Sequence, residues 1–274
     1  MRHQGYIGIG LLCAAAGLAH GQVGVLVSEL VASTSTSGGG YGHDVDILGD
    51  QVIVGSPGTE AAFVFDITDS GSPSQLYMLE PSVAYEDEEM WFGTSVCLSP
   101  SLFVVGTDIA TEAFDPESAV YFFDSSDGSL DHRDGRLVYS DIGNSLAANG
   151  DIVVSGAPKA DGVDKYRGPG AVVRFDTSSS YSNTDLAAPY SYPDKDHFGW
   201  SVAISDSYIL AGGPSNFDPK ILLGETQLYS FSGTPLYTLT ASDEAAGDEF
   251  GWSVALSEEY DIAAVGTPQA HVGG

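Results

Sequence analysis

The stretch FGWSVAIS, residues 198–205, returns almost unchanged as FGWSVALS at residues 250–257. Three weaker copies precede these two, and they begin at Tyr41, Phe92 and Ile142. Measured from the second residue of each copy, the spacings along the chain are 51, 50, 56 and 52 residues. A repeat of this length predicts a set of similar units that stack on one another, because one unit alone buries too little apolar surface.

Each copy opens and closes with a glycine. The opening glycine is the second residue of the copy, and the closing glycine ends the apolar segment that follows. The opening glycines are Gly42, Gly93, Gly143, Gly199 and Gly251, and the closing glycines are Gly55, Gly106, Gly156, Gly212 and Gly266. The separation is 13 residues in the first four copies and 15 in the fifth. A glycine at the end of a strand predicts a tight turn or a close backbone approach.

The first two β patterns of each unit differ in how they distribute apolar residues. In the first, Val202 and Ile204 share one face, and the small residues Ser201 and Ala203 share the other. The second pattern is apolar on both faces, as in residues 103–105 (FVV). We therefore expect the second strand to be buried between two layers, and the bulky face of one unit to pack on the small face of its neighbour.

Two further β patterns complete each unit. Third strands are predicted at residues 61–66, 119–124, 171–176 and 227–231, and fourth strands at residues 75–82, 136–141, 186–191 and 235–242. No window shows sustained helical periodicity. Four short strands in a unit of about 50 residues are typical of a β-propeller blade, so the chain is predicted to be an all-β propeller of four-stranded blades.

The motif residues carry a resemblance to a known family. The pairs Phe92-Gly93, Phe198-Gly199 and Phe250-Gly251, with Tyr41-Gly42 and Ile142-Gly143 as variants, resemble the FG of FG-GAP repeats. Gly156-Ala157-Pro158 matches the GAP portion fully, and the other closing segments match it in part. The resemblance covers residues 27–274 and implies a propeller like that of integrin alpha subunits and of many bacterial secreted proteins.

The number of blades is left open by the sequence. Five units begin near residues 41, 92, 142, 198 and 250, and the last stops where its third strand should begin. Because propellers of the family usually have seven blades, we favour a fragment of a larger ring. The alternative is a five-bladed ring that closes through residues 27–33, which resemble the fourth-strand segments.

The N-terminal residues 1–21 have the features of a secretory signal peptide. A basic start at Arg2 is followed by an apolar run from about Tyr6 to Leu18, and small residues precede Gln22. The propeller then occupies residues 22–274 of a secreted, extracellular or cell-envelope protein without an integral membrane segment. Cleavage leaves Cys97 as the single cysteine, and we expect it to be a small buried core residue.

The composition excludes two classes of partner. The formal net charge is −29, with 38 acidic and 9 basic residues. Such a surface repels nucleic-acid phosphate and anionic lipid. We expect no cofactor and no nucleic-acid partner, and we interpret the charge as a solvated acidic surface.

A calcium role is not carried over from the family. Integrin-type repeats often have a D-x-D-x-D-G loop between the first two strands, whereas this chain has short turns at residues 99–101, 149–151, 205–207 and 257–259. Other acidic positions are weak calcium candidates, with solvated turns as the preferred interpretation. These candidates are Asp124, Asp127, Asp194, Asp196, Asp243 and Asp248.

The sequence gives little indication of catalysis. His43, His132, His197 and His271 are scattered, and we expect each to have a surface or turn role. The sequence beyond residue 21 contains no H-E-x-x-H, G-x-S-x-G or C-x-x-C motif.

Three tryptophans raise the question of a carbohydrate site. Trp200 and Trp252 share one repeat position, which favours packing between blades over stacking on a sugar ring. Trp91 precedes an FG pair and is the tryptophan that we expect to be exposed.

These observations favour a secreted non-enzymatic propeller that binds or scaffolds an extracellular protein or glycan. The recognition surface is expected in variable loops such as residues 159–168 and 215–225. One alternative is a propeller-based polysaccharide-active enzyme, which would need a cluster of His, Tyr and acidic residues in the central funnel. Another is a structural repeat protein of the cell envelope.

Overall fold

The computed structural model describes residues 9–12, 26–34, 38–81, 90–108, 118–136, 141–160, 170–188, 197–214, 224–242 and 247–270. Regular structure in these ranges is β, apart from two short 3₁₀ turns, η1 (Pro57–Thr59) and η2 (Thr177–Ser179). The all-β prediction is confirmed.

Four antiparallel sheets each contain four consecutive strands, and every strand pairs with its neighbour in sequence. Blade one holds β3 (Val45–Leu48), β4 (Gln51–Ser56), β5 (Ala61–Asp66) and β6 (Ser74–Leu79). Blade two holds β7 (Ser95–Leu98), β8 (Leu102–Gly106), β9 (Ser118–Asp124) and β10 (Leu130–Arg136). Blade three holds β11 (Ser145–Asn149), β12 (Ile152–Ala157), β13 (Ala171–Asp176) and β14 (Ser182–Ala187). Blade four holds β15 (Ser201–Ile204), β16 (Tyr208–Gly213), β17 (Glu225–Ser230) and β18 (Pro235–Leu239).

Two smaller sheets lie at either end of this series. The described part of blade five is the hairpin of β19 (Ser253–Ser257) and β20 (Ile262–Gly266). At the other end, β1 (Ile9–Leu12) pairs with β2 (Leu26–Leu30). Residues 27–33, the possible ring-closing strand, include most of β2, which pairs here with β1 from the predicted signal peptide, so ring closure stays a prediction. Leu30 and Ala32 pack with Phe63 of blade one, which buries both side chains.

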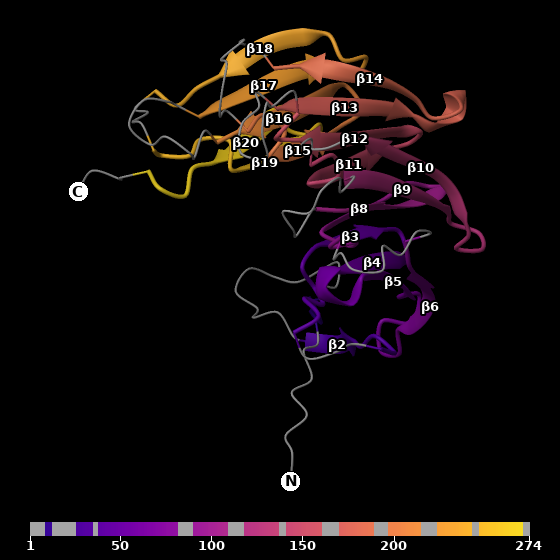
Figure 1. Ribbon diagram of the computed structural model, residues 1–274. Helices are drawn as coiled ribbons and strands as arrows, with labels where there is room; N and C mark the ends of the chain where they lie inside the picture. Colours follow the sequence, from indigo (N-terminus) through magenta and orange to yellow (C-terminus); the bar gives the residue numbers. More distant parts are fainter. Residues whose placement is uncertain are drawn as a thin grey trace.

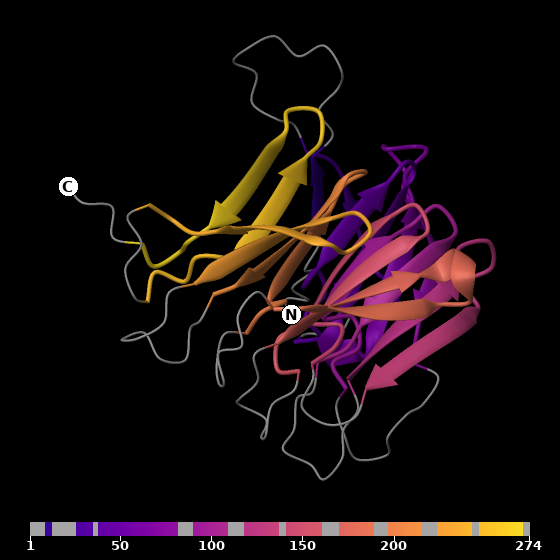
Figure 2. The same cartoon turned by 90° about the horizontal axis from the view of Figure 1, so that it is seen from above.

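The blades are arranged around a common centre. The first strands of successive blades, β3, β7, β11, β15 and β19, pack against one another in that order. Figure 1 shows the sheets side by side from indigo blade one to yellow β19 and β20, and Figure 2 shows them fanned out when seen from above. The first strand of each blade is therefore the innermost and the fourth is the outermost.

Side chains between blades follow the predicted alternation. Val96 and Leu98 of β7 pack into the cluster that contains Ile53 and Val64 of blade one. Cys97, on the opposite face of β7, belongs to the next cluster together with residues of blade three. The two faces of β7 therefore meet different neighbouring blades, and the buried position predicted for Cys97, which is 2% exposed, is confirmed.

The repeated glycines lie where two blades approach most closely. An added Cβ on each of the first four closing glycines would meet the carbonyl oxygen of the next blade's opening glycine. These distances are 2.1 Å from Gly55 to Gly93, 2.1 Å from Gly106 to Gly143, 1.8 Å from Gly156 to Gly199, and 2.1 Å from Gly212 to Gly251. A real Cβ cannot occupy such space, so only glycine allows this contact between blades.

The fourth strands of blades two and three differ from the prediction. They were expected at residues 136–141 and 186–191, but β10 ends at Arg136 and β14 ends at Ala187. A tight turn after β9, in which the Asp124 N–H donates to the Ser129 carbonyl, makes the chain return at once. The outermost strand is less buried than the inner strands, so a polar segment such as LDHRDGR is tolerated there. The apolar content of a segment is therefore a poor guide to the position of this strand.

Candidate functional site at the channel mouth

The innermost strands enclose a cavity of about 340 Å³ along the centre of the propeller. Its lining comes from all five blades: residues 44–46, 96–97, 146–148, 202–204 and 254–256. Most of these side chains are aliphatic or small. The polar exceptions are Asp44 and Asp46 of blade one and the thiol of Cys97.

The two carboxylates of the channel bind backbone groups of the neighbouring blade. Asp44 Oδ2 accepts a hydrogen bond from Val96 N–H, and Asp46 Oδ2 accepts one from Leu98 N–H, each 2.8 Å long. Their Oδ1 atoms accept from Val45 and Ile47 N–H. Asp44 occupies the position of Ser95, Ser145 and Ser201 in the later blades. The carboxylates thus satisfy edge N–H groups of β7, and burial raises the pKa of Asp44.

At one end of the channel, all five blades repeat the same backbone turn. The residue before each motif and the opening glycine both have positive φ. The residue after the opening glycine then donates its N–H to the carbonyl of the residue before the motif, at 3.0–3.2 Å. The five donors are His43, Thr94, Asn144, Trp200 and Trp252, which we call the mouth ring.

Side chains of the mouth ring reach from one blade to the next. His43 Nδ1 lies 2.9 Å from the Thr94 carbonyl oxygen, and Asn144 Nδ2 donates to the Trp200 carbonyl oxygen at 3.1 Å. The Trp200 and Trp252 rings lie 5.1 Å apart with planes inclined at 46°. The mouth ring directly precedes the strands that wall the channel, so its backbone turns lie together at one end of the channel.

Exposure of the tryptophans differs in part from expectation. Trp91 is 39% exposed, as expected, and Glu60 accepts hydrogen bonds from its N–H and from that of Phe92. Trp200 and Trp252 contact each other between blades four and five, which agrees with a packing role. Trp252 is also 38% exposed, and it lies in the last described blade of the series.

A buried ion pair lies on the same side of the propeller. Asp141, which directly precedes the Ile142-Gly143 motif, is 3% exposed and forms an ion pair with Lys159. The pKa of Asp141 is raised to about 6, first by burial and then by the Asp108 charge, while Lys159 acts in the opposite direction. Sequence reasoning missed this pair. The only available indication was Lys159 directly after the GAP motif, in a chain with 9 basic residues.

The predicted acidic candidates are not brought together in the described part of the chain. Asp124 and Asp127 lie in the turn after β9, where their Oδ1 atoms accept the N–H groups of Ser126 and Ser129. Hydrogen bonds from Ser129 lower the pKa of Asp127. The backbone carbonyl of Asp248 accepts from Gln269 and Thr267. Asp194, Asp196 and Asp243 lie outside the described residues. Within the described ranges, no three His, Cys, Asp or Glu side chains could share a metal ion.

Two histidines have a setting that the sequence did not indicate. His197 lies in its expected turn but is buried, and its ring stacks on Trp200 with centroids 6.0 Å apart. His132 lies in β10 and stacks on Tyr181 of blade three at 4.2 Å. His43 is exposed at the mouth, and His271 lies outside the described residues.

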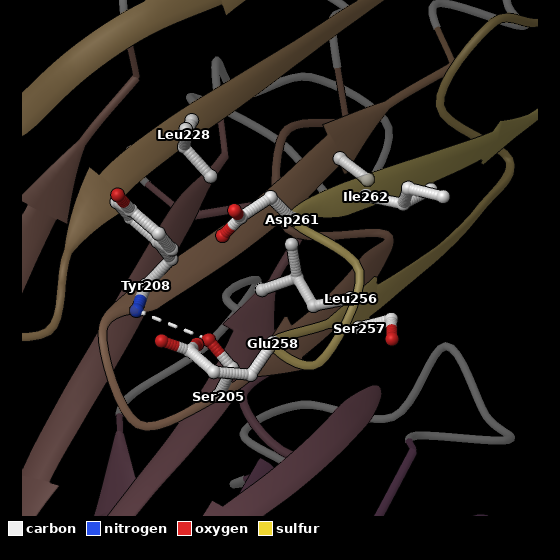
Figure 3. A pocket seen from close by; sticks show the side chains of 9 residues that line it. Ser205, Tyr208, Leu228, Leu256, Ser257, Glu258, Asp261 and Ile262 are labelled. Atoms are coloured by element: carbon white, nitrogen blue, oxygen red, sulfur yellow. Dashed lines mark hydrogen bonds between the residues drawn. The ribbon is translucent and has the colours of Figure 1, made fainter.

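A second cavity, of about 330 Å³, lies between blades four and five at the opposite end of the strands. Figure 3 shows Leu228, Leu256 and Ile262 around it, with Glu258 and Asp261 on turns at its edge. Glu258 Oε1 accepts a hydrogen bond from Ser207 Oγ at 2.6 Å, which ties the two turns together.

The repeat explains why this second cavity is open. Leu228 of the third strand in blade four pairs with Leu210, and Phe122 of the third strand in blade two pairs with Val104. Leu210 and Val104 each lie two residues before a closing glycine, so Leu228 and Phe122 occupy the same position in their blades. Phe122 packs against Phe175 of the next blade's third strand, at 5.3 Å. At the junction of blades two and three, the third-strand side chain Phe175 fills the position that corresponds to this cavity. The described part of blade five comprises only β19 and β20. We assign no ligand to the cavity.

Comparison with known proteins supports the repeat and the fold. The FG-GAP repeat model matches residues 236–274, which span β18 to β20. This match confirms the resemblance that the motif residues indicated. A search of curated proteins found no match.

Solved structures of similar fold are distant in sequence. A functionally unknown protein from Desulfotomaculum acetoxidans shares 11% identity at a TM-score of 0.54, over 86% of this chain and 66% of that protein. Hydrazine synthase from Kuenenia stuttgartiensis shares 12% identity at a TM-score of 0.51, over 82% of this chain and 61% of that one. A europium-containing methanol dehydrogenase shares 10% identity at 0.50, over 75% and 42%.

These similarities are limited to the fold. The identities are too low to transfer an activity, and the chain spans less than two thirds of each of the three structures. Among the described residues, no helix has the length and apolarity needed to cross a bilayer.

Proposed function

We propose that this FG-GAP repeat propeller is a secreted, non-catalytic binding module whose recognition surface is the channel mouth. The observation that carries the proposal is the mouth ring. Five blades hold one backbone turn constant, while the side chain that it presents changes from His to Thr, Asn and Trp. A rigid scaffold with variable side chains around one opening is the usual design of a binding surface.

The chemistry of the channel supports binding rather than turnover. Asp44 and Asp46 each accept two backbone N–H groups, and two of these hydrogen bonds join β3 to β7. A carboxylate held in this way has a structural task at the junction. The Asp141–Lys159 pair likewise links two segments of the same face.

The charge of the chain narrows the class of partner. With a net charge of −29, the protein repels polyanions, so the partner is a neutral or basic component of the cell exterior. The predicted signal peptide at residues 1–21 and the extracellular setting of the repeat family support the proposal that the protein is secreted.

The proposal is tested by comparing the two ends of the strands. The purified chain is passed over immobilised neutral polysaccharides and basic glycoproteins, and product release is followed in parallel. We expect retention that is lost when His43 and Trp252 at the mouth are both replaced by alanine. The matched control replaces Tyr260, which is 67% exposed in the turn between β19 and β20 at the opposite end. Loss of retention with Tyr260→Ala alone, or release of cleavage products, would overturn the proposal.

A further inference from the structure

Trp200 and Trp252 form an aromatic surface at the channel entrance. They occupy the same position in neighbouring blades, their rings lie 5.1 Å apart, and Trp252 is 38% exposed. Exposed tryptophan is uncommon on a surface that serves only solubility, because its large apolar area gains from burial. Two adjacent indoles offer a wider apolar surface than one, at a point where a ligand can reach them.

The surroundings hold this surface in place. The buried ring of His197 stacks on Trp200, at 6.0 Å between centroids and 29° between planes. Asn144 donates to the Trp200 carbonyl oxygen, so the backbone of Trp200 is fixed from the side of blade three. A surface fixed in this way loses little conformational freedom when a ligand binds.

Polar groups lie next to the indoles. The side chain of Asn144 reaches the Trp200 backbone from blade three, and its amide oxygen is an acceptor that can take a hydroxyl donor. Aromatic faces with a few polar groups beside them suit a ring that has apolar C–H faces and hydroxyl edges.

The negative charge around the entrance favours uncharged sugar rings over acidic ones. Asp44 and Asp46 lie one and three residues after His43, inside the channel, and Glu249 lies three residues before Trp252. These carboxylates oppose the approach of an acidic sugar. They do not oppose an uncharged one.

From these observations we infer that the Trp200–Trp252 pair is a stacking site for the pyranose rings of a neutral glycan. This inference rests on the proposed function and names the ligand class of the same surface. Asn144 supplies the hydrogen bond that orients the ring. Binding involves no covalent step.

The test uses the whole chain and defined oligosaccharides. Cellohexaose and mannohexaose serve as neutral probes, hexagalacturonate serves as the anionic probe, and tryptophan fluorescence and calorimetry report binding. We expect saturable binding of at least one neutral probe, weakened about tenfold by Trp252→Ala and less by Trp252→Phe, since one aromatic contact is worth roughly one factor of ten. Hexagalacturonate should bind at least tenfold more weakly than the neutral probe.

Trp91→Ala is the matched control, because Trp91 is the same residue type with almost the same exposed fraction outside the mouth ring. It should change affinity less than twofold. If Trp252→Ala shifts the unfolding midpoint, Trp252→Phe and Trp200→Phe replace it as the deciding variants.

Two results would overturn the inference and spare the proposed function. One is neutral-probe binding that Trp252→Ala and Trp200→Phe leave unchanged. The other is the absence of neutral-probe binding while the mouth still retains basic glycoproteins. Loss of all retention at the mouth would overturn both.

Discussion

A Cβ atom placed on Gly156 would lie 1.8 Å from the carbonyl oxygen of Gly199. Gly156 closes the second strand of blade three, and Gly199 opens blade four. The same relationship links three other pairs of blades, at 2.1 Å in each. The two glycines of the repeat are therefore two sides of one contact, and neither can be understood within a single blade.

Gly156→Ala should destabilise the fold by more than about 3 kcal/mol, because the methyl group would overlap backbone of blade four and the Ser145 hydroxyl. Gly150 in the same blade is the control. It has φ +57 but nothing within 4 Å of its added Cβ, so Gly150→Ala should cost only about 1 kcal/mol of backbone strain. Urea unfolding followed by circular dichroism measures both. Equal losses would show that the contact between blades is not the cause.

Asp141 should make stability depend on pH in an unusual direction. Its pKa is raised from 3.8 to about 6 in the folded chain, chiefly by burial. Between pH 6 and 3.8 the folded chain binds a proton that the unfolded chain does not, so the contribution of this group to stability rises as the pH falls. Above pH 6 this contribution is lost.

Asp141→Asn removes this dependence. When the pH falls from 7.5 to 4.5, the wild type should therefore gain unfolding free energy relative to Asp141→Asn. Lys159→Met should move the transition to higher pH, because the ammonium lowers the pKa of Asp141. Parallel curves for wild type and Asp141→Asn would contradict the assignment.

Cys97 should resist alkylation as long as the propeller is folded. The thiol is 2% exposed, and burial raises its pKa, with the nearby charges of Asp46 and Asp44 adding to the effect. Iodoacetamide needs an accessible thiolate. Labelling at pH 8 should therefore be slow in buffer and rapid in urea, at the concentration where circular dichroism reports unfolding. Rapid labelling of the native chain would mean that blades two and three separate easily.

Calcium should leave the thermal midpoint unchanged. Asp124 and Asp127 already direct carboxylate oxygens to backbone N–H groups of their own turn, which leaves them poorly placed to share an ion. The midpoint is compared in 5 mM EDTA and in 5 mM calcium chloride, concentrations of about the order at which weak extracellular calcium sites would fill. A rise of several degrees in calcium would restore the acidic candidates as a metal site.

Sequence reasoning succeeded where a residue's task is set by its position in the repeat. The alternation of Val96 and Leu98 with Ser95 and Cys97 predicted two faces of different size, and these faces do meet different neighbouring blades. Sequence reasoning failed at the outermost strands. In blade two it placed the fourth strand in the more apolar residues 136–141, whereas β10 is formed by the polar segment LDHRDGR. β10 is held mainly by backbone hydrogen bonds to β9, and such bonds place little demand on the type of side chain.

The sequence by itself determined the all-β propeller, its period and the positions of its glycines, because every blade repeats the same physical requirements and five copies average out local ambiguity. Only the tertiary structure decided what gathers at the channel mouth. Asn144, Trp200 and Trp252 are more than 50 residues apart along the chain and come together through the closure of neighbouring blades. The Asp141–Lys159 pair has the same origin, since the carboxylate and ammonium meet only after blade three has folded back on itself. Contacts that arise from closure depend on distance in space, which no local pattern of residues records.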